Sequence, residues 1–283
     1  MRIRLKLFYT ALFMSHICYG QHQERQVLLY NIGLGGLTSG IGSIINTPKG
    51  QNWKKNFVRS FWQGCAGGVL HYTGKKTVFL INKNQSLSMA WAAKLQHAAG
   101  SSITESAAAN RPFLQNWNIN VGPVRIDYSF GNRKLNLRFL ASSVYTCIAG
   151  FSLGTLDAKS SLMTGVLVFK TDKLISGDYA GGTYGTGIVY YNDSGKFHTI
   201  AHEYIHSLQY SEYVTFNTWL NPLTSKVGSN KLKNVFQNHI YLDLPYLNLF
   251  YWLEGQYSYY YYYRNFYELE AERFATNSYV PVH

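Results

Sequence analysis

The stretch from Phe197 to Tyr210 constrains this chain most, because it places the motif His-Glu-x-x-His in a segment that favours a helix. No glycine or proline interrupts residues 196–214, and apolar residues recur there at helical spacing. Residues four apart on a helix share a face, so His202 and His206 can direct two imidazoles toward one metal ion. Glu203 follows the first histidine by one residue, which suits a general base acting on a metal-activated water.

The motif alone also fits a polar helix face with two packed histidines, so a metal site depends on a third ligand. The segment Asn265–Ala275 reads NFYELEAERFA and carries three glutamates in a chain with only 14 acidic residues. On a helix, Glu268 and Glu272 share a face, whereas Glu270 points elsewhere. We therefore expect Glu268 to complete the metal site. Asp193 and Ser194, just before the motif, are typical helix-capping residues.

Together the two motifs resemble the gluzincin metallopeptidases, especially the CAAX prenyl protease and HtpX-like family, whose second motif commonly reads E-x-E-A-D-x-F-A. The resemblance covers these two short motifs only. It implies a zinc ion bound by His202, His206 and Glu268, with Glu203 as the catalytic base. Glu272 stands where the family has an aspartate that orients a ligand histidine by a hydrogen bond. The enzymes of this family hydrolyse peptide bonds.

Two other residues compete for a place in the site. Trp252-Leu253-Glu254-Gly255 resembles the W-L-x-E-G segment of other gluzincins, in which the glutamate binds zinc, although one residue is missing between Leu and Glu. Glu254 is therefore an alternative third ligand. His198 precedes His202 by four residues, so it is either a further ligand or a first-turn histidine near the mouth of the site.

Residues 1–20 have the organisation of a secretory signal peptide, with a basic start, an apolar core at residues 7–14 and Gly20 before the cleavage point. An uncleaved membrane anchor is the alternative, although the apolar run is short for a span. We expect an exported protein that is periplasmic, outer-membrane associated or secreted. After export Cys65 and Cys147 remain, either as one disulfide or as two free thiols.

Cleavage would lower the net charge from +12 to about +9. The basic residues are dispersed, and no nucleic-acid-binding motif is present, so we expect no nucleic-acid partner. Anionic lipid headgroups, acidic surface polymers or envelope proteins fit this charge better.

The N-terminal part is rich in glycine and alanine. Residues 26–48 carry no charge and contain five glycines, and a second weakly polar run, Ser60–Gly74, contains three more before its last residue. Such stretches fit either close-packed membrane helices or a glycine-rich soluble region. Residues 84–110 are alanine-rich and predict a helix.

Alternating apolar and polar residues predict strands at 118–121, 124–128 and 134–139, with further strands at 164–171 and 187–191. The last strand leads into the metal helix, where zinc peptidases often pair an extended substrate with an edge strand. The glycines of residues 177–187 predict a mobile loop near that edge. The aromatic run at 242–263 fits either a packed helix or a surface role.

The sequence therefore predicts an α+β fold with a zincin-like core: an active-site helix, a small mixed or antiparallel sheet and a glycine/alanine-rich helical N-terminal part. We expect a signal peptide at 1–20, the helical region at 21–115 and a metallopeptidase-like region at 116–283. The predicted function is zinc-dependent hydrolysis of peptide bonds in a peptide or protein substrate. The alternatives are a weakly active or inactive metal-binding accessory protein of the cell envelope, and an integral membrane protein whose histidines are core residues.

Overall fold

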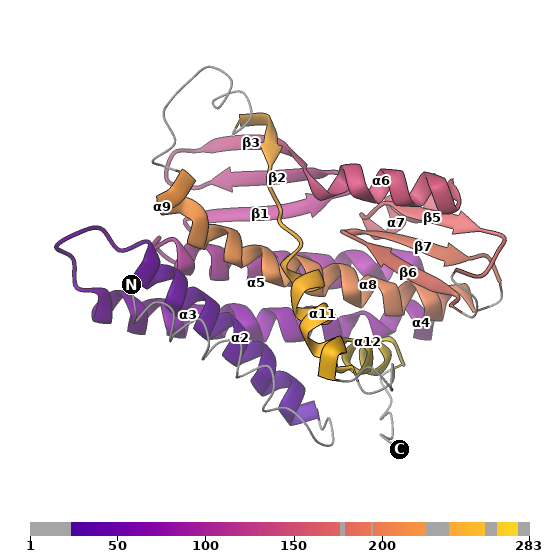
Figure 1. The fold of residues 1–283 in the computed structure, drawn as a ribbon, viewed down its shortest axis with the longest axis horizontal. Coiled ribbons are helices and arrows are strands. Elements are labelled where there is room, and N and C mark those ends of the chain that lie inside the picture. Colours follow the sequence, from indigo (N-terminus) through magenta and orange to yellow (C-terminus); the bar gives the residue numbers. More distant parts are fainter. Residues whose placement is uncertain (1–23, 176–178, 194, 225–237, 258–264, 277–283) are drawn as a thin grey trace.

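The structure, a computed structural model, describes residues 24–175, 179–193, 195–224, 238–257 and 265–276 (Figure 1). For residues 223–224 and 252–257 it describes the backbone alone. The predicted signal peptide and residues 258–263 of the aromatic run lie outside the described residues.

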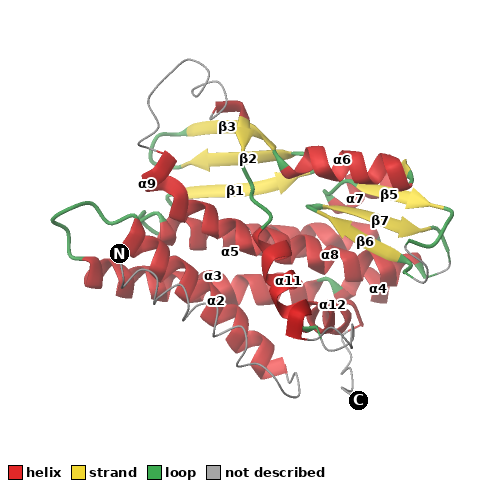
Figure 2. Cartoon of the chain, viewed as in Figure 1, coloured by secondary structure: helices red, strands yellow, loops and turns green. Residues whose placement is uncertain are grey.

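The fold is α+β, with two small mixed sheets on one side of a helical layer (Figures 1 and 2). The N-terminal helices are α2 (Glu24–Ile45), α3 (Trp53–Thr77), α4 (Phe79–Asn84), the short 3₁₀ helix η1 (Leu87–Met89) and α5 (Ala90–Ala108). The predicted helix at 84–110 is thus shorter at its start, because Gln85 adopts a left-handed conformation with φ of 48° and ends α4.

The first sheet has the order β1-β2-β3-β8, and its members are β1 (Asn116–Val121), β2 (Val124–Ser129), β3 (Lys134–Leu140) and β8 (Ile240–Tyr241). The first three strands confirm the predicted positions and pair antiparallel, whereas β8 pairs parallel with β3. Helix α6 (Ser142–Leu153) follows β3 and leads to the second sheet.

The second sheet has the order β4-β5-β7-β6, and its members are β4 (Thr155–Leu156), β5 (Val168–Thr171), β6 (Gly181–Tyr184) and β7 (Gly187–Tyr191). Helix α7 (Ala158–Thr164) occupies the start of what the sequence predicted as one strand at 164–171; Gly165, with φ of 70°, ends that helix. Two sheets are therefore present where the sequence predicted one.

The prediction that residues 187–191 form an edge strand is wrong. Strand β7 lies between β5 and β6, and the edge strand next to it is β6, inside the segment predicted as a loop. Its glycines do not indicate a loop: a Cβ on Gly181 would lie 2.6 Å from Thr199 and 2.9 Å from Glu203 of the neighbouring helix. Glycine permits this close approach, and Gly185, with φ of 65°, makes the tight turn into β7.

Helix α8 (Lys196–Tyr213) runs through the middle of the molecule. Its apolar residues Ile200, Tyr204 and Ile205 are buried between the second sheet and helix α12 (Phe266–Thr276). The N-cap is Gly195 without a side-chain cap, so Asp193 does not cap the helix; its carboxylate instead accepts a hydrogen bond from the Gly195 N–H at 2.9 Å. Ser194, the other predicted cap, lies outside the described residues.

The chain after α8 continues through the 3₁₀ helix η2 (Val214–Leu220), α9 (Asn221–Thr224) and α11 (Tyr246–Tyr257). Phe250 and Tyr251 of α11 pack against the buried rings of Tyr213, Phe216 and Tyr267. Residues 246–251 of the aromatic run therefore belong to a helix that packs against the core. Cys65 and Cys147 are both free thiols, so they form no disulfide.

Helix α2 has the length and composition to cross a membrane, but half of its apolar window is buried inside the protein, and a core helix has the same properties. It packs against α3 at very short range. A Cβ on Gly35 would lie 2.4 Å from the carbonyl oxygen of Gly64, and one on Gly68 would lie 2.2 Å from that of Asn31. The glycines predicted to mediate close packing do so between these two helices.

This contact predicts that alanine substitutions at two glycines of α2 change the free energy of unfolding in opposite directions. Gly35→Ala should lower the free energy of unfolding by about 1–3 kcal/mol, because a methyl group there displaces backbone atoms. Gly33→Ala meets nothing within 4 Å and should raise it by up to about 1 kcal/mol, since alanine favours helix. Urea unfolding of both variants measures this. Equal stabilities would contradict the close contact.

Candidate metal centre

Helices α8 and α12 bring two histidines and one glutamate together. The Nε2 atoms of His202 and His206 lie 3.3 Å apart, and the Glu268 Oε2 atom lies 3.1 Å and 3.4 Å from them respectively. His206 and Glu268 are buried, and the His202 side chain is 14% exposed. These three residues form one of the buried groups of the described chain that could hold a metal ion.

The size of this triangle fits a tetrahedral site. Ligands that bind a zinc-sized ion at about 2.0–2.1 Å with tetrahedral angles lie about 3.3–3.4 Å apart. The three donor–donor distances of 3.1, 3.3 and 3.4 Å are close to that value. A cation at the centre would therefore need little movement of the side chains.

The other ring nitrogen of each histidine faces an acceptor. His202 Nδ1 lies 3.2 Å from Glu272 Oε2, and His206 Nδ1 lies 2.8 Å from the side-chain oxygen of Gln209. A proton on each Nδ1 satisfies these oxygens and leaves both Nε2 lone pairs pointing into the triangle. A histidine that binds a metal ion through Nε2 needs this tautomer. Gln209 was not singled out from the sequence, although it lies one helical turn beyond His206 on the same helix.

Tyr251 of α11 is a second contact that the sequence did not identify. Its hydroxyl donates a hydrogen bond of 2.8 Å to Glu268 Oε1, the oxygen that does not face the histidines. Burial and the adjacent Glu268 carboxylate raise the pKa of Tyr251, so the hydroxyl keeps its proton. The bond holds the glutamate in place, and only the fold brings these residues together.

The pKa shifts of the histidines and glutamates show that this centre favours a positive charge. Burial lowers the pKa of His202, but hydrogen bonds to Glu268 and Glu272 outweigh burial and raise it to about 10. For Glu268, burial raises the pKa, and the two histidines outweigh burial and lower it. The hydrogen bonds from His198 and then His202 lower the pKa of Glu272 to about 2. Without a metal, protons on the histidines supply the positive charge that these carboxylates need.

Glu203 follows His202 on α8, and Thr183 of β6, an edge strand of the second sheet, holds it. The Thr183 hydroxyl of β6 lies 2.8 Å from Glu203 Oε2 and 2.9 Å from the Glu203 carbonyl oxygen, and it can donate to either. The Glu203 charge contributes to raising the pKa of both His202 and His206. Glu203 is only 8% exposed.

The other histidine and glutamates considered as ligands lie elsewhere or outside the described side chains. His198 Nε2 lies 3.2 Å from Glu272 Oε1, outside the triangle, and its side chain is 42% exposed. It is a partly exposed histidine of the first turn of α8. Glu254 belongs to the part of α11 whose side chains lie outside the described residues. Glu270 points away from the triangle, as helical spacing predicts, and contacts Lys75, Gln209 and Asn31.

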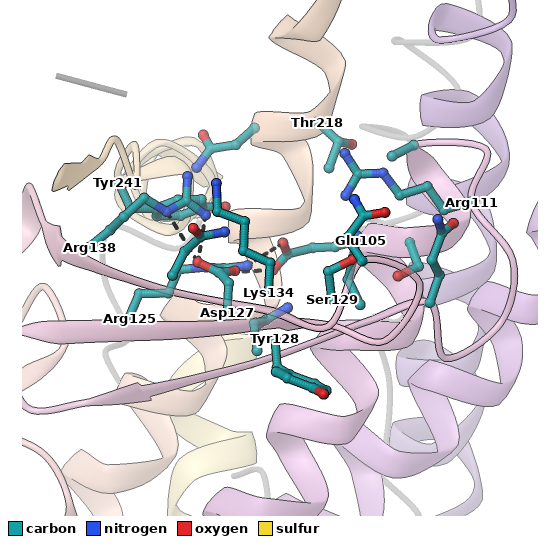
Figure 3. A pocket seen from close by; sticks show the side chains of 18 of the residues that line it. Glu105, Arg111, Arg125, Asp127, Tyr128, Ser129, Lys134, Arg138, Thr218 and Tyr241 are labelled. Carbon is teal, nitrogen blue, oxygen red and sulfur yellow. Dashed lines mark hydrogen bonds and ion pairs between the residues drawn. The ribbon is translucent and has the colours of Figure 1, made fainter. Parts of the chain in front are cut away.

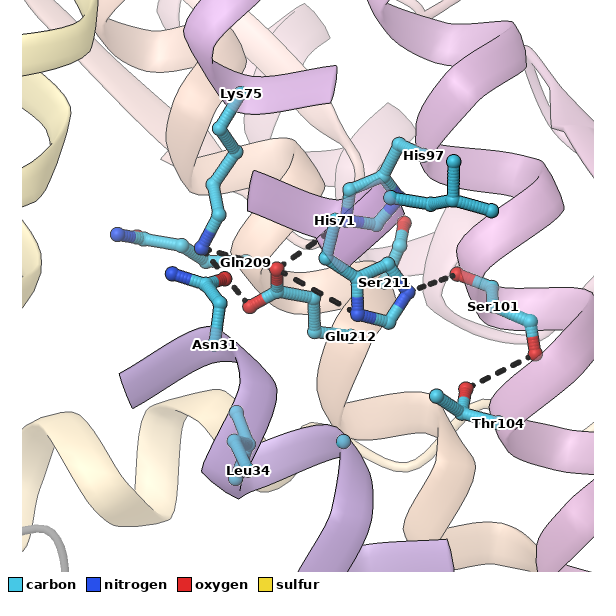
Figure 4. A network of polar contacts seen from close by, with 12 residues as sticks. Asn31, Leu34, His71, Lys75, His97, Ser101, Thr104, Gln209, Ser211 and Glu212 are labelled. Atoms are coloured by element: carbon cyan, nitrogen blue, oxygen red, sulfur yellow. Dashed lines mark hydrogen bonds and ion pairs between the residues drawn. The ribbon is translucent and has the colours of Figure 1, made fainter. Parts of the chain in front are cut away.

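A second buried group, His71, His97 and Glu212, could also hold a metal by composition. The ammonium of Lys75 already supplies a cation there, 2.9 Å from Glu212 Oε1 (Figure 4). It also lies 2.8 Å from Glu270 Oε1. The two imidazoles stack, with ring centroids 4.5 Å apart, and one nitrogen of each ring lies 3.8 Å and 3.5 Å from Glu212 Oε1. Burial lowers the pKa of His71 to about 3, so it stays neutral. We interpret this group as a buried ion network.

The two buried groups are connected. Gln209 accepts from His206 Nδ1 and donates through Nε2 to Glu270 Oε2 at 2.8 Å, and Glu270 in turn pairs with Lys75. The orientation of a triangle histidine therefore depends on an ion pair in the helical layer.

Comparisons of the chain with family models, with curated proteins and with solved structures find no match.

The triangle predicts that one divalent metal ion binds per chain. His202→Ala should abolish this binding, and Glu272→Ala should weaken it about 10–100-fold, because Glu272 orients a ligand ring. His198→Ala is the matched control and should keep a full equivalent of metal. Metal analysis after equilibration with zinc measures the stoichiometry. Equal metal loss in the His198 and His202 variants would contradict the assignment of ligands.

The raised pKa of His202 predicts how metal affinity depends on pH. A metal ion must displace the proton that His202 carries at neutral pH, so rising pH favours the metal-bound form. The association constant should increase about tenfold per pH unit for each proton released. Competition with a chelator at pH 6, 7 and 8 measures it. A constant affinity across this interval would show that no protonated histidine is displaced.

The ion network predicts that replacing Lys75 destabilises the fold strongly. Lys75→Met leaves the carboxylates of Glu212 and Glu270 buried without their counter-charge, which should lower the free energy of unfolding by about 3–5 kcal/mol. Lys76→Met is the control, because this exposed neighbour pairs with the exposed Glu24 and such pairs contribute under about 1 kcal/mol. Urea unfolding compares the two. Similar losses would contradict the role of Lys75.

Proposed function

We propose that this protein is a zinc-dependent metallopeptidase with a gluzincin-like catalytic centre on a zincin-like core. The observation that carries the proposal is the convergence of the His-Glu-x-x-His helix α8 with Glu268 of α12 in a triangle of tetrahedral size. The two motifs lie 62 or more residues apart in the sequence, yet their side chains meet at one point. If the two histidines were only packed core residues, no glutamate of the second motif would need to face them.

In this proposal His202, His206 and Glu268 hold the ion. Two imidazoles and one carboxylate suit zinc, and catalytic zinc sites commonly have three protein ligands with a further position for water or substrate. Bound zinc would supply Lewis acidity toward water and the scissile carbonyl. Glu203 Oε accepts the proton of the attacking water and passes it to the leaving amine. Thr183 positions that carboxylate through its hydrogen bond.

Strand β6 supports an extended peptide as substrate. Among the described residues it pairs on one side with β7 only, which leaves its other edge open for main-chain hydrogen bonds. The same strand contacts Glu203 through Thr183 and lies against it at Gly181. A peptide paired with β6 would therefore lie along the catalytic base.

The proposed setting is the cell envelope. The signal-peptide pattern of residues 1–20 supports export, and the net charge of about +9 after cleavage favours contact with anionic surfaces.

The alternative function is a metal-binding accessory protein of the same envelope. The observation that favours it is the burial of two ligands, since His206 and Glu268 are 8% and 7% exposed.

Hydrolysis of an unbiased peptide mixture by the zinc-loaded protein tests the proposal. Glu203→Gln should bind zinc normally and lose activity by about 100- to 10,000-fold, because it removes the general base. Glu24→Gln, an acid-to-amide change on the exposed end of α2, should leave activity unchanged. Zinc binding without hydrolysis by the wild type would favour the accessory protein, and equal activity of the Glu203 variant would refute this mechanism.

A further inference from the structure

The first sheet turns a polar face toward the body of the protein. Arg125, Asp127 and Ser129 of β2 lie opposite Arg138, Asn136 and Lys134 of β3, so alternate residues of both strands share one face. Strand β1 adds asparagines at its own alternate positions. A face of this composition must find polar partners, because a buried polar group without one is unfavourable.

This face lines a cavity of about 560 Å³ between the sheet, α5 and the segment of η2 and α9 (Figure 3). The volume lies within the roughly 300–1,000 Å³ of sites for small ligands. Unlike most such sites it is almost wholly polar: apart from Ala109 and two tyrosines, every described lining residue has a polar or charged side chain. None of the residues of the metal centre lines it.

The floor of the cavity is held by ion pairs. Arg125, which is 3% exposed, binds Glu105 through both terminal nitrogens, at 2.7 and 3.2 Å, and Asp127 at 2.8 Å. Arg138 binds the other Asp127 oxygen at 2.6 Å. Both guanidinium groups lie over the ring of Tyr241, 4.0 and 4.7 Å from its centre. These contacts form a rigid floor before any ligand arrives.

The rim is positively charged. Both carboxylates of the lining are paired with Arg125 and Arg138. Arg111 and Lys134 are exposed at the cavity, so their charge is not offset by a lining carboxylate. Arginine and lysine in such a position favour a carboxylate or phosphate group.

The remaining lining favours hydroxyl groups. Eight of the lining residues are asparagine or glutamine, and each carboxamide both donates and accepts hydrogen bonds, as a sugar hydroxyl does. A nucleotide base could not stack on either described tyrosine of the lining: both arginines lie over Tyr241, and Tyr128 points to the other side of the strands (Figure 3). The apolar side chains of a peptide would find almost no apolar lining.

We propose that this cavity binds a carbohydrate that carries carboxylate or phosphate groups. Arg111 and Lys134 contact the acidic group, and carboxamides such as Asn136 contact the hydroxyls. The site is separate from the metal centre, so it would attach the protein to an acidic glycan whether or not the hydrolase proposal holds.

Calorimetric titration of the full chain tests this with named probes: trigalacturonic acid for carboxylates, mannose 6-phosphate for phosphates, and maltotriose, inorganic phosphate and ATP as comparisons. One acidic saccharide should bind more tightly than maltotriose, phosphate and ATP, which also identifies the acidic group. The double variant Arg111→Ala/Lys134→Ala should weaken that binding roughly 10- to 100-fold. The matched control Lys159→Ala/Lys173→Ala removes two exposed lysines elsewhere and should bind normally.

Asn136→Ala keeps the charge of the cavity and should weaken binding of the same saccharide severalfold, which tests the hydroxyl contacts even where the double variant does not fold. The proposal is overturned if neither acidic saccharide binds, if phosphate or ATP binds as tightly as the saccharide, or if the folded variants of the cavity bind like wild type.

Discussion

Two buried carboxylates on one short helix, each in need of a cation, are the constraint on which much of this structure depends. Helix α12 carries Glu268 and Glu270 into the core, at 7% and 2% exposure. Burying a carboxylate without a partner is costly, so the surrounding elements must supply positive charge. Lys75 of α3 does so for Glu270. For Glu268 the two histidines of α8 do so, and a metal ion would complete this arrangement.

The glycine-rich helices α2 and α3 contact the Glu270 carboxylate through Asn31 and Lys75. Because Gly68 has no side chain, α3 lies directly against the backbone of α2 at Asn31. Asn31 donates to Glu270 at 3.0 Å from one helix, and Lys75 pairs with the same carboxylate from the other. A stretch that resembles a membrane segment by composition is therefore part of the support for α12 and, through Gln209, for His206.

The sheet β1-β2-β3-β8 shows the reverse of the usual arrangement of faces. Its polar side turns inward over the cavity, while Leu135, Leu137 and Phe139 on the other side of β3 are 58%, 56% and 61% exposed. A half-buried sheet ordinarily has its apolar side inward. The inward polar side is explained by the ion pairs of Arg125 with Glu105 and Asp127, which satisfy the buried charges and leave a hydrophilic cavity above them.

The sequence by itself determined the features that depend on neighbours along the chain. Helical spacing placed His202 and His206 on one face and separated Glu270 from Glu268 and Glu272, and alternation located β1, β2 and β3. Only the tertiary structure decided that β6, and not β7, is an edge strand, that Tyr251 and Gln209 hold Glu268 and His206, and that Lys75 supplies the cation of the second buried group. These contacts join residues far apart in the chain or depend on which face of an element is covered. Local periodicity carries no information about such pairings, because packing, charge neutralisation and hydrogen bonding between distant segments select them together.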